Sequence, residues 1–503
     1  MARSYRYKDW AMYAQDSYKL TPRLTLNYGV RYEHYGVQHN NNQNLDSNFY
    51  YGSGSTFFEQ VANGQVEIAP KSSVGQLWAP RWGTVAPRVG FAYDPFGRGK
   101  TVIRGGGGIF YSIHDRDNYQ STIQYTPPIQ YNSQINYTTV QTFIDSLGYQ
   151  FPSSIQGYDP NRQIQKTYNF SFGVQQDVGF GMVLDVAYVG ALGRHLVVRR
   201  NLNTTPLGTN FQPQNLDPTN GNKVYPSQFL RPYLGYGDIQ YYYFGGNSNY
   251  HSLQTTLRRR YKRGLTYGVV WTWSKAMDYA DEDYTANAQV SNVVNQKIWN
   301  YGRAAFDRTH IFRFYWNYNL PRASGLIRNA VIKAAFDDWQ VSGKLALQSG
   351  APMGLSYTYS PSQDITGSTD AGRVLMIGNP VLPKDQRTFN QAFNTAAIAA
   401  PPIAACQVPN PPQICWGNAP KDVFRGPGVN DWDTSLFKNF PIHERMRGQF
   451  RVEAYNVFNH TQFNGVNTSA QFNAAGTQIN TALGQYTGTL NPRRLQLALR
   501  VSF

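Results

Sequence analysis

Large apolar side chains recur at every second position in many separate segments of this chain. Residues 24–33 show the pattern, with large apolar side chains at Leu24, Leu26, Tyr28, Val30 and Tyr32. Segments 265–273 and 495–503 follow the same rule. Because a β-strand sends successive side chains to opposite faces, each segment predicts a strand with one apolar and one polar face.

Ionised side chains occupy the polar face of these predicted strands. They include Arg31, Glu33, Arg313, Arg451, Glu453 and Arg500. Charged groups are costly to bury in a dry core, so this face must be wet. The fold class that we predict is all-β, a transmembrane antiparallel outer-membrane β-barrel in which these six residues face the lumen. A soluble propeller or sandwich with one solvated face also alternates and remains the alternative.

Short and long connections follow one another between the predicted strands. We expect about thirteen strands, at 9–20, 24–36, 86–95, 101–112, 165–178, 182–199, 249–261, 265–275, 307–320, 338–350, 430–440, 446–459 and 491–503. The long polar connections run roughly over 37–85, 113–164, 201–248, 276–306, 352–429 and 460–490. Short periplasmic turns on one rim and long extracellular loops on the other are typical of outer-membrane barrels.

The odd strand number makes a prediction about the start of the chain. Bacterial single-chain barrels have an even number of strands and both ends in the periplasm. We therefore expect residues 1–503 to form one barrel domain, the C-terminal part of a larger barrel that has lost its opening strands. No apolar stretch follows the basic start at 1–10, so we also expect no signal peptide in this chain.

Amino-acid composition restricts the possible class of protein further. Aromatic residues make up 15% of the chain, as many as the charged ones, yet the mean hydropathy is -0.50. No apolar run approaches the roughly 18 residues that a membrane-spanning helix needs, which excludes a helical membrane protein. The net charge of +16 raises the possibility of nucleic-acid binding. Positive charge is spread over strands and loops, however, so we favour lumen charge and contact with anionic lipopolysaccharide, and expect no nucleic-acid partner.

Residues that could carry chemistry are few, and none forms a catalytic motif, so we expect no enzyme, cofactor or metal site. Cys406 and Cys415 close a short Pro-rich loop and are either a disulfide or two free thiols. The glycines at 105–108 lie within an alternating segment with no helix after them, unlike a phosphate loop. Four acidic residues at 278–283 lack the spacing of a calcium loop and are expected to form a solvated loop.

Several stretches resemble the C-terminal barrel of TonB-dependent receptors, and within them the Oar-like branch. They lie at 9–33, 86–97, 248–254, 271–275, 338–343, 348–352, 424–428 and 453–460. The resemblance implies outer-membrane uptake of an unidentified ligand. Members of that family carry a signal peptide, a carboxypeptidase-regulatory-like domain, a TonB-binding segment and a plug before the barrel. We expect this chain to lack all of them, so that the TonB complex would act only through a plug that is absent from this chain.

The end of the chain resembles the signal by which the outer-membrane assembly machinery recognises its clients. The residues that carry it are Leu499, Val501 and Phe503. The implied partners are therefore outer-membrane lipid, lipopolysaccharide and that machinery. A passive porin-like channel and a structural or adhesive surface protein remain as alternative functions.

Replacing Phe503 with Asp should abolish membrane insertion if the terminal strand is an assembly signal. Burying one aromatic side chain against lipid contributes only on the order of 2 to 3 kcal/mol, so a large defect has to be a failure of recognition. The matched control is Phe172→Asp, on a predicted lipid-facing position. The measurement is the heat-modifiable folded fraction in the outer membrane, with the chain joined to a plug. Equal losses for the two variants would make Phe503 ordinary lipid-facing surface.

Overall fold

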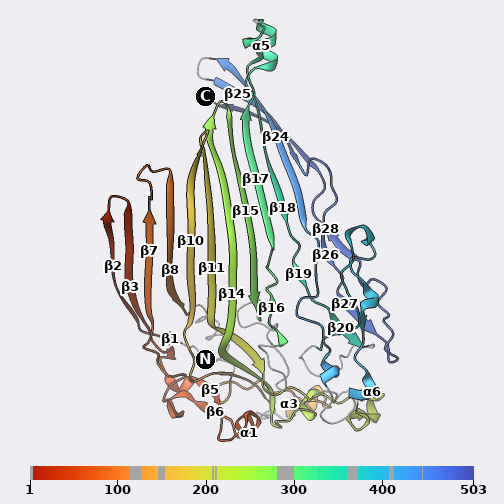
Figure 1. The fold of residues 1–503 in the computed structure, drawn as a ribbon. Coiled ribbons are helices and arrows are strands. Elements are labelled where there is room, and N and C mark those ends of the chain that lie inside the picture. Colours follow the sequence, from red (N-terminus) through yellow and green to blue (C-terminus); the bar gives the residue numbers. More distant parts are fainter. Residues whose placement is uncertain are drawn as a thin grey trace.

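One long antiparallel wall of strands dominates the computed structural model (Figure 1). The structure describes residues 4–113, 126–145, 153–206, 209, 212–279, 299–327, 329–359, 372–406, 413–443 and 446–502. The main sheet has 15 strands, of which a continuous path joins neighbours in chain order. That path runs through β2 (Asp9–Thr21), β3 (Leu24–Tyr35), β7 (Val85–Tyr93), β8 (Thr101–Ser112), β10 (Gln165–Gly179), β11 (Met182–Asn201), β14 (Tyr236–Lys262), β15 (Leu265–Asp278), β17 (His310–Asn319), β18 (Trp339–Gln348), β24 (Val429–His443), β25 (Met446–Tyr455) and β29 (Arg494–Ser502).

The alternating segments therefore form the strands that the sequence predicted, and the all-β class is confirmed. The segment predicted at 101–112 is β8, and most other boundaries differ by only a few residues. Each strand pairs antiparallel with its neighbours along the path. In membrane barrels this pattern satisfies the backbone N–H and C=O groups between strands. Within the described residues, no helix is long and apolar enough to cross a membrane.

The prediction for β14 was wrong at its start. This strand begins at Tyr236, whereas residues 201–248 were expected to be a loop. Its first half pairs with the end of β11 and, in parallel, with β9 (Ser153–Tyr158). Ile239 and Tyr241 enter one buried cluster, while Tyr242 and Phe244 enter another. Because both faces are covered here, the alternation of apolar and polar residues that identifies a strand with one wet face disappears.

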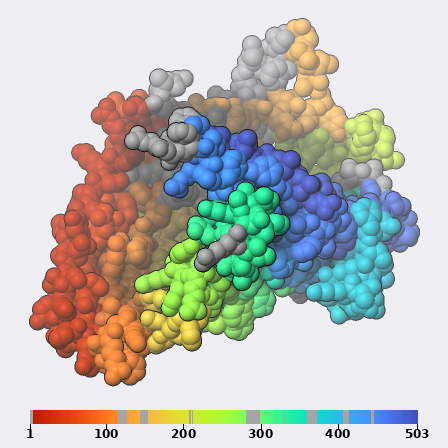
Figure 2. All heavy atoms as spheres, turned by 90° about the horizontal axis from the view of Figure 1, so that it is seen from above, coloured from red at the N-terminus to blue at the C-terminus, as the bar shows by residue number. Residues whose placement is uncertain are grey.

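The two rims of the wall differ. One rim carries the short turns and the small helix α5 (Ala330–Phe336), and the other carries the long connections with α1 (Phe57–Ala62), α3 (Val140–Asp145) and α6 (Ile403–Cys406) (Figure 1). Viewed from the short-turn rim, α5 lies nearest the viewer, with the N-terminal strands to its left and the C-terminal strands to its right (Figure 2). The predicted sorting of short and long connections is present.

The wall has two edges. Strands β2 and β29 lie at the ends of the pairing order, and no pairing joins them within the described residues. Every side chain of β2 is exposed, as are all but one in β29. The wall is thus an open sheet in this structure rather than a closed cylinder.

The four glycines of β8 make room for aromatic rings on the neighbouring strands. A Cβ on Gly105 would come within 2.8 Å of the ring of Phe91 and 3.3 Å of that of Phe172. On the opposite face, a Cβ on Gly108 would lie 3.0 Å from the side chain of Arg88. Glycine at these positions lets large side chains on β7 and β10 lie across the strand, which agrees with the absence of a phosphate loop.

Hydrophobic cores lie at the long-connection rim, among the long connections and the ends of β11 and β14 that extend into them. The largest cluster buries residues from 355–424 together with residues from 466–483, among them Tyr357, Phe393 and Phe472. A parallel pair, β20 (Ser356–Tyr359) and β27 (Ser469–Phe472), joins these two connections. The regions that the sequence analysis described only as long polar connections therefore pack into an ordered layer.

Buried ion pairs tie the layer to the ends of the strands. Asp307, just before β17, pairs with Arg425 and accepts a hydrogen bond from the backbone N–H of Ala276 at 2.6 Å. The Asp307 side chain is only 1% exposed. Lys421 pairs in the same way with the buried carboxylate of Asp278. The two ion pairs join residues 118 and 143 positions apart.

Replacing Asp307 with Ala should lower the free energy of opening the loop layer by about 3 kcal/mol, because the Arg425 guanidinium is then partly buried without its carboxylate. The measurement is hydrogen exchange of backbone amides at 352–359 and 413–428. The double variant Asp307→Ala/Arg425→Ala should cost less than the sum of the single changes, since the two side chains act as a unit. Additive costs would show that the pair contributes no coupling.

Candidate functional site: the polar face of the wall

The pairing register places all six charged residues singled out from the sequence on one face of the wall. Arg31 lies opposite Ala86, and Arg313 lies opposite both Val270 and Ala346. Residues directly opposite each other share a face, and every second residue along a strand does too. Following these pairs from β3 to β29 brings Arg31, Glu33, Arg313, Arg451, Glu453 and Arg500 to the same side, which we call the polar face.

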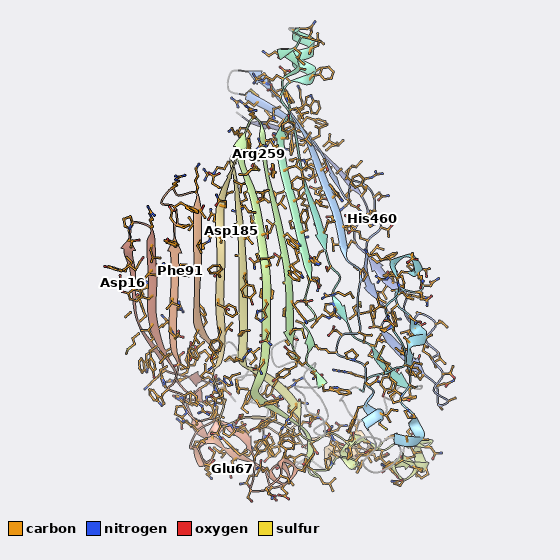
Figure 3. All side chains as sticks on the ribbon, viewed as in Figure 1. Asp16, Glu67, Phe91, Asp185, Arg259 and His460 are labelled. Carbon is orange, nitrogen blue, oxygen red and sulfur yellow. The ribbon has the colours of Figure 1, made fainter. Side chains whose placement is uncertain are left out.

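Ion pairs cross this face at intervals. The Nε of Arg31 lies 2.7 Å from a carboxylate oxygen of Glu33, whose other oxygen accepts a hydrogen bond from Tyr35. Lys344 lies 2.8 Å from Asp433 on the neighbouring strand. Arg104 pairs with Asp185, which Figure 3 labels on β11. Pairs in which one partner is well exposed contribute little stability, about 0–1 kcal/mol each, so their value lies in a fixed pattern of charge.

Arginines without a carboxylate partner gather near the short-turn rim. A hollow of about 990 Å³ there is lined by Arg447, Arg451 and Arg500 together with Gln449 and Asp338. Asp338 pairs with Arg322 at 3.4 Å. In the part of the chain that the structure describes, no carboxylate forms an ion pair with Arg447, Arg451 or Arg500. The polar face therefore ends in a cationic hollow.

At the other rim, Arg373 joins two long connections. Its guanidinium donates hydrogen bonds to the carbonyl oxygens of Trp299 and Ala419 and to the side chain of Asn300, and it lies 4.5 Å from the centre of the Trp299 ring. Burial lowers the pKa of Arg373 to about 10, with Asp422 opposing the shift. Such a many-sided contact fixes the loop layer over the end of the wall.

The remaining residues singled out from the sequence lie outside the polar face. Leu499 and Val501 point to the apolar face of the edge strand β29 and are exposed, whereas Phe503 lies outside the described residues. Cys415 is buried in the loop layer and is disulfide-bonded. The side chain of Cys406 is not among those described, so the pairing of these two cysteines stays a prediction.

The expectation of a solvated acidic loop is wrong for Asp278, the one member of that group within the described residues. Its side chain is 5% exposed and pairs with Lys421. The alternation that identifies strands gives no information about a partner 143 positions away. No group of three or more His, Cys, Asp and Glu side chains suited to a metal occurs in the ranges that the structure describes.

Several charged residues of the polar face were not predicted from the sequence. They include Lys19, Arg88, Arg104, Asp177, Asp185, Arg258, Lys344, Asp431, Asp433 and Arg447. A stricter count along every predicted strand would have found them, because each occupies the position that alternation assigns to this face. No alternating pattern in the sequence predicts the contacts of Arg373 and Arg425.

Comparison with known proteins identifies the family. The chain matches the outer membrane beta barrel domain over residues 1–496. No curated protein sequence matches it. Among solved structures, it is similar to the outer membrane transporter YddB from Escherichia coli, with 10% identity, a TM-score of 0.45, and coverage of 98% of this chain and 53% of that one.

Two further structures are similar at the same level. They are the ferric-catecholate import receptor Fiu from K12 E. coli, with 11% identity and a TM-score of 0.41, and the siderophore receptor PiuA from Acinetobacter baumannii, with 10% identity and a TM-score of 0.42. Each alignment covers 98% of this chain. It covers only 44% of the Fiu chain and 43% of the PiuA chain. Scores this low carry no conclusion about ligand or activity. The match over residues 1–496, together with the antiparallel wall, shows that this chain belongs to the outer membrane β-barrel domain family.

Proposed function

We propose that this chain forms the barrel wall of an outer-membrane receptor that takes up a ligand by the TonB-dependent route, in the Oar-like branch. The observation that carries the proposal is the charged polar face. It extends along the strands from the packed loop layer to the cationic hollow at the opposite rim. In a closed barrel this face would line the lumen, while the apolar face would meet lipid. That arrangement would give a ligand path with fixed charges from the loop layer to the cationic hollow.

The packed loop layer favours a receptor over a passive channel. Its two long connections share a hydrophobic core and are held by the contacts of Arg373 and by the Asp307–Arg425 pair. An ordered surface of this kind offers fixed polar groups to a ligand before it enters the lumen. The same layer could also serve adhesion, which makes a surface protein the competing function.

The partners follow from this proposal. Outer-membrane lipid and lipopolysaccharide would surround the apolar face, and the assembly machinery would recognise the strand that ends at Phe503. The TonB complex would act through a plug domain encoded before Met1. The ligand stays unassigned, because the fold alone does not specify it.

The genomic sequence upstream of Met1 provides the first test. An in-frame plug and signal peptide would support the receptor. A promoter and a signal sequence leading directly into Met1 would instead favour a porin or an adhesin.

Reversing the charge of Arg313 should shift the ion selectivity of the reconstituted chain toward cations, because this residue would then line the pore with negative charge. The measurement is the reversal potential in planar bilayers under a salt gradient. Lys223→Glu, an equal charge change at an exposed position in the short strand β13 (Lys223–Val224) of a long connection, is the control and should leave the selectivity unchanged. Identical reversal potentials for Arg313→Glu and the unmodified chain would contradict a lumen position for the polar face.

A further inference from the structure

The densest basic run of the chain, residues 258–263, is divided between the two faces of the wall. Arg258 lies opposite Gly268 on the polar face. Arg259 lies opposite Met182 and Tyr267 on the apolar face. Arg263 occupies the tight turn between β14 and β15 with a φ of 54°. Arg259 therefore lies on the face that would meet the membrane, and Arg263 lies at the rim of that face.

Both arginines line a groove on the apolar face. This groove has a volume of about 700 Å³, and its other lining residues are Leu265, Tyr267, Phe314, Trp316, Tyr318 and Val341. The rings of Phe314 and Trp316 stack with their centres 5.0 Å apart. Trp316 reaches across Gly343, where a Cβ would approach the ring within 2.3 Å. The groove floor is therefore aromatic.

The arginine charge in the groove faces an aromatic ring, with the Cζ of Arg259 6.0 Å from the centre of the Tyr267 ring, but no carboxylate among the described residues. The Nε of Arg259 is buried without a hydrogen-bond partner. Among the described residues, neither Arg259 nor Arg263 forms an ion pair with a carboxylate. A partly desolvated guanidinium without an anion is unfavourable, so the site is complementary to a negatively charged group.

The depth of the groove matches the headgroup region. Arg259 lies three residues before Lys262, the last residue of β14, or roughly 10 Å along the strand. Figure 3 shows Arg259 close to the short-turn rim. Aromatic side chains concentrate at this depth in membrane barrels, and basic pockets at membrane surfaces bind anionic headgroups.

We propose that this groove binds a phospholipid of the periplasmic leaflet. Its phosphate lies between Arg259 and Arg263, whose guanidinium groups suit bidentate phosphate contacts, and an acyl chain lies over Tyr267 and Trp316. The occupant is a lipid rather than free phosphate, because most of the groove is apolar and opens on the membrane face. Nucleic acid is not favoured, because Arg259 is half-buried among the aromatic side chains of that face.

Native mass spectrometry provides the test. The full chain is folded in nonionic detergent and titrated with dioleoyl phosphatidylglycerol. We expect one tightly retained lipid, and at least a tenfold weaker affinity for Arg259→Gln/Arg263→Gln. Arg258→Gln removes the same charge from the adjacent residue on the opposite face and should change the affinity less than twofold. Arg259→Gln alone should weaken binding clearly more than this control.

Further measurements separate a lipid site from simpler explanations. Trp316→Ala should weaken retention of the lipid several-fold, since the acyl chain loses its aromatic surface. All variants are first checked for the heat-modifiable folded form, so that a folding defect is not read as lost binding. Equal loss for Arg258→Gln and Arg259→Gln would overturn the site, as would unchanged affinity in the double variant. Complete displacement of the lipid by inorganic phosphate would also overturn it in favour of a simple anion site.

Discussion

Backbone pairing between neighbouring strands is the constraint on which the rest of this structure depends. Lipid offers no hydrogen-bond partners, so a spanning strand must satisfy its N–H and C=O groups on adjacent strands. The strands between β2 and β29 meet this requirement with an antiparallel neighbour on each side, whereas β2 and β29 each have one such neighbour among the described residues. Once that register is set, the face of every side chain is determined. The charged polar face and the aromatic apolar face are both consequences of it.

The loop layer is stabilised by other interactions than the wall. Its residues lie outside the membrane-spanning part of the wall. Side-chain packing and buried ion pairs stabilise it, in addition to backbone hydrogen bonds between strands. Tyr357 and Phe472 meet from two connections, and the Asp307–Arg425 pair attaches the layer to the start of β17. The receptor surface that we propose therefore depends on contacts between distant parts of the chain.

Arginine has three roles in this fold. On the polar face it sets the charge pattern, in the loop layer Arg373 collects carbonyl groups, and on the apolar face Arg259 lies in an aromatic groove. Arginines in all three roles contribute to the net charge of +16. A basic composition alone does not distinguish between them, because each depends on the face to which a residue points.

The sequence by itself determined the strands, their order, the two faces and the family resemblance. Alternation with a period of two is local information, so β8 and the polar positions of Arg31 and Arg313 could be predicted without coordinates. The tertiary structure alone decided the first half of β14, the loop cores and the pair between Lys421 and Asp278. Those features lack alternation or join residues far apart in the chain, and only three-dimensional packing determines which of them meet.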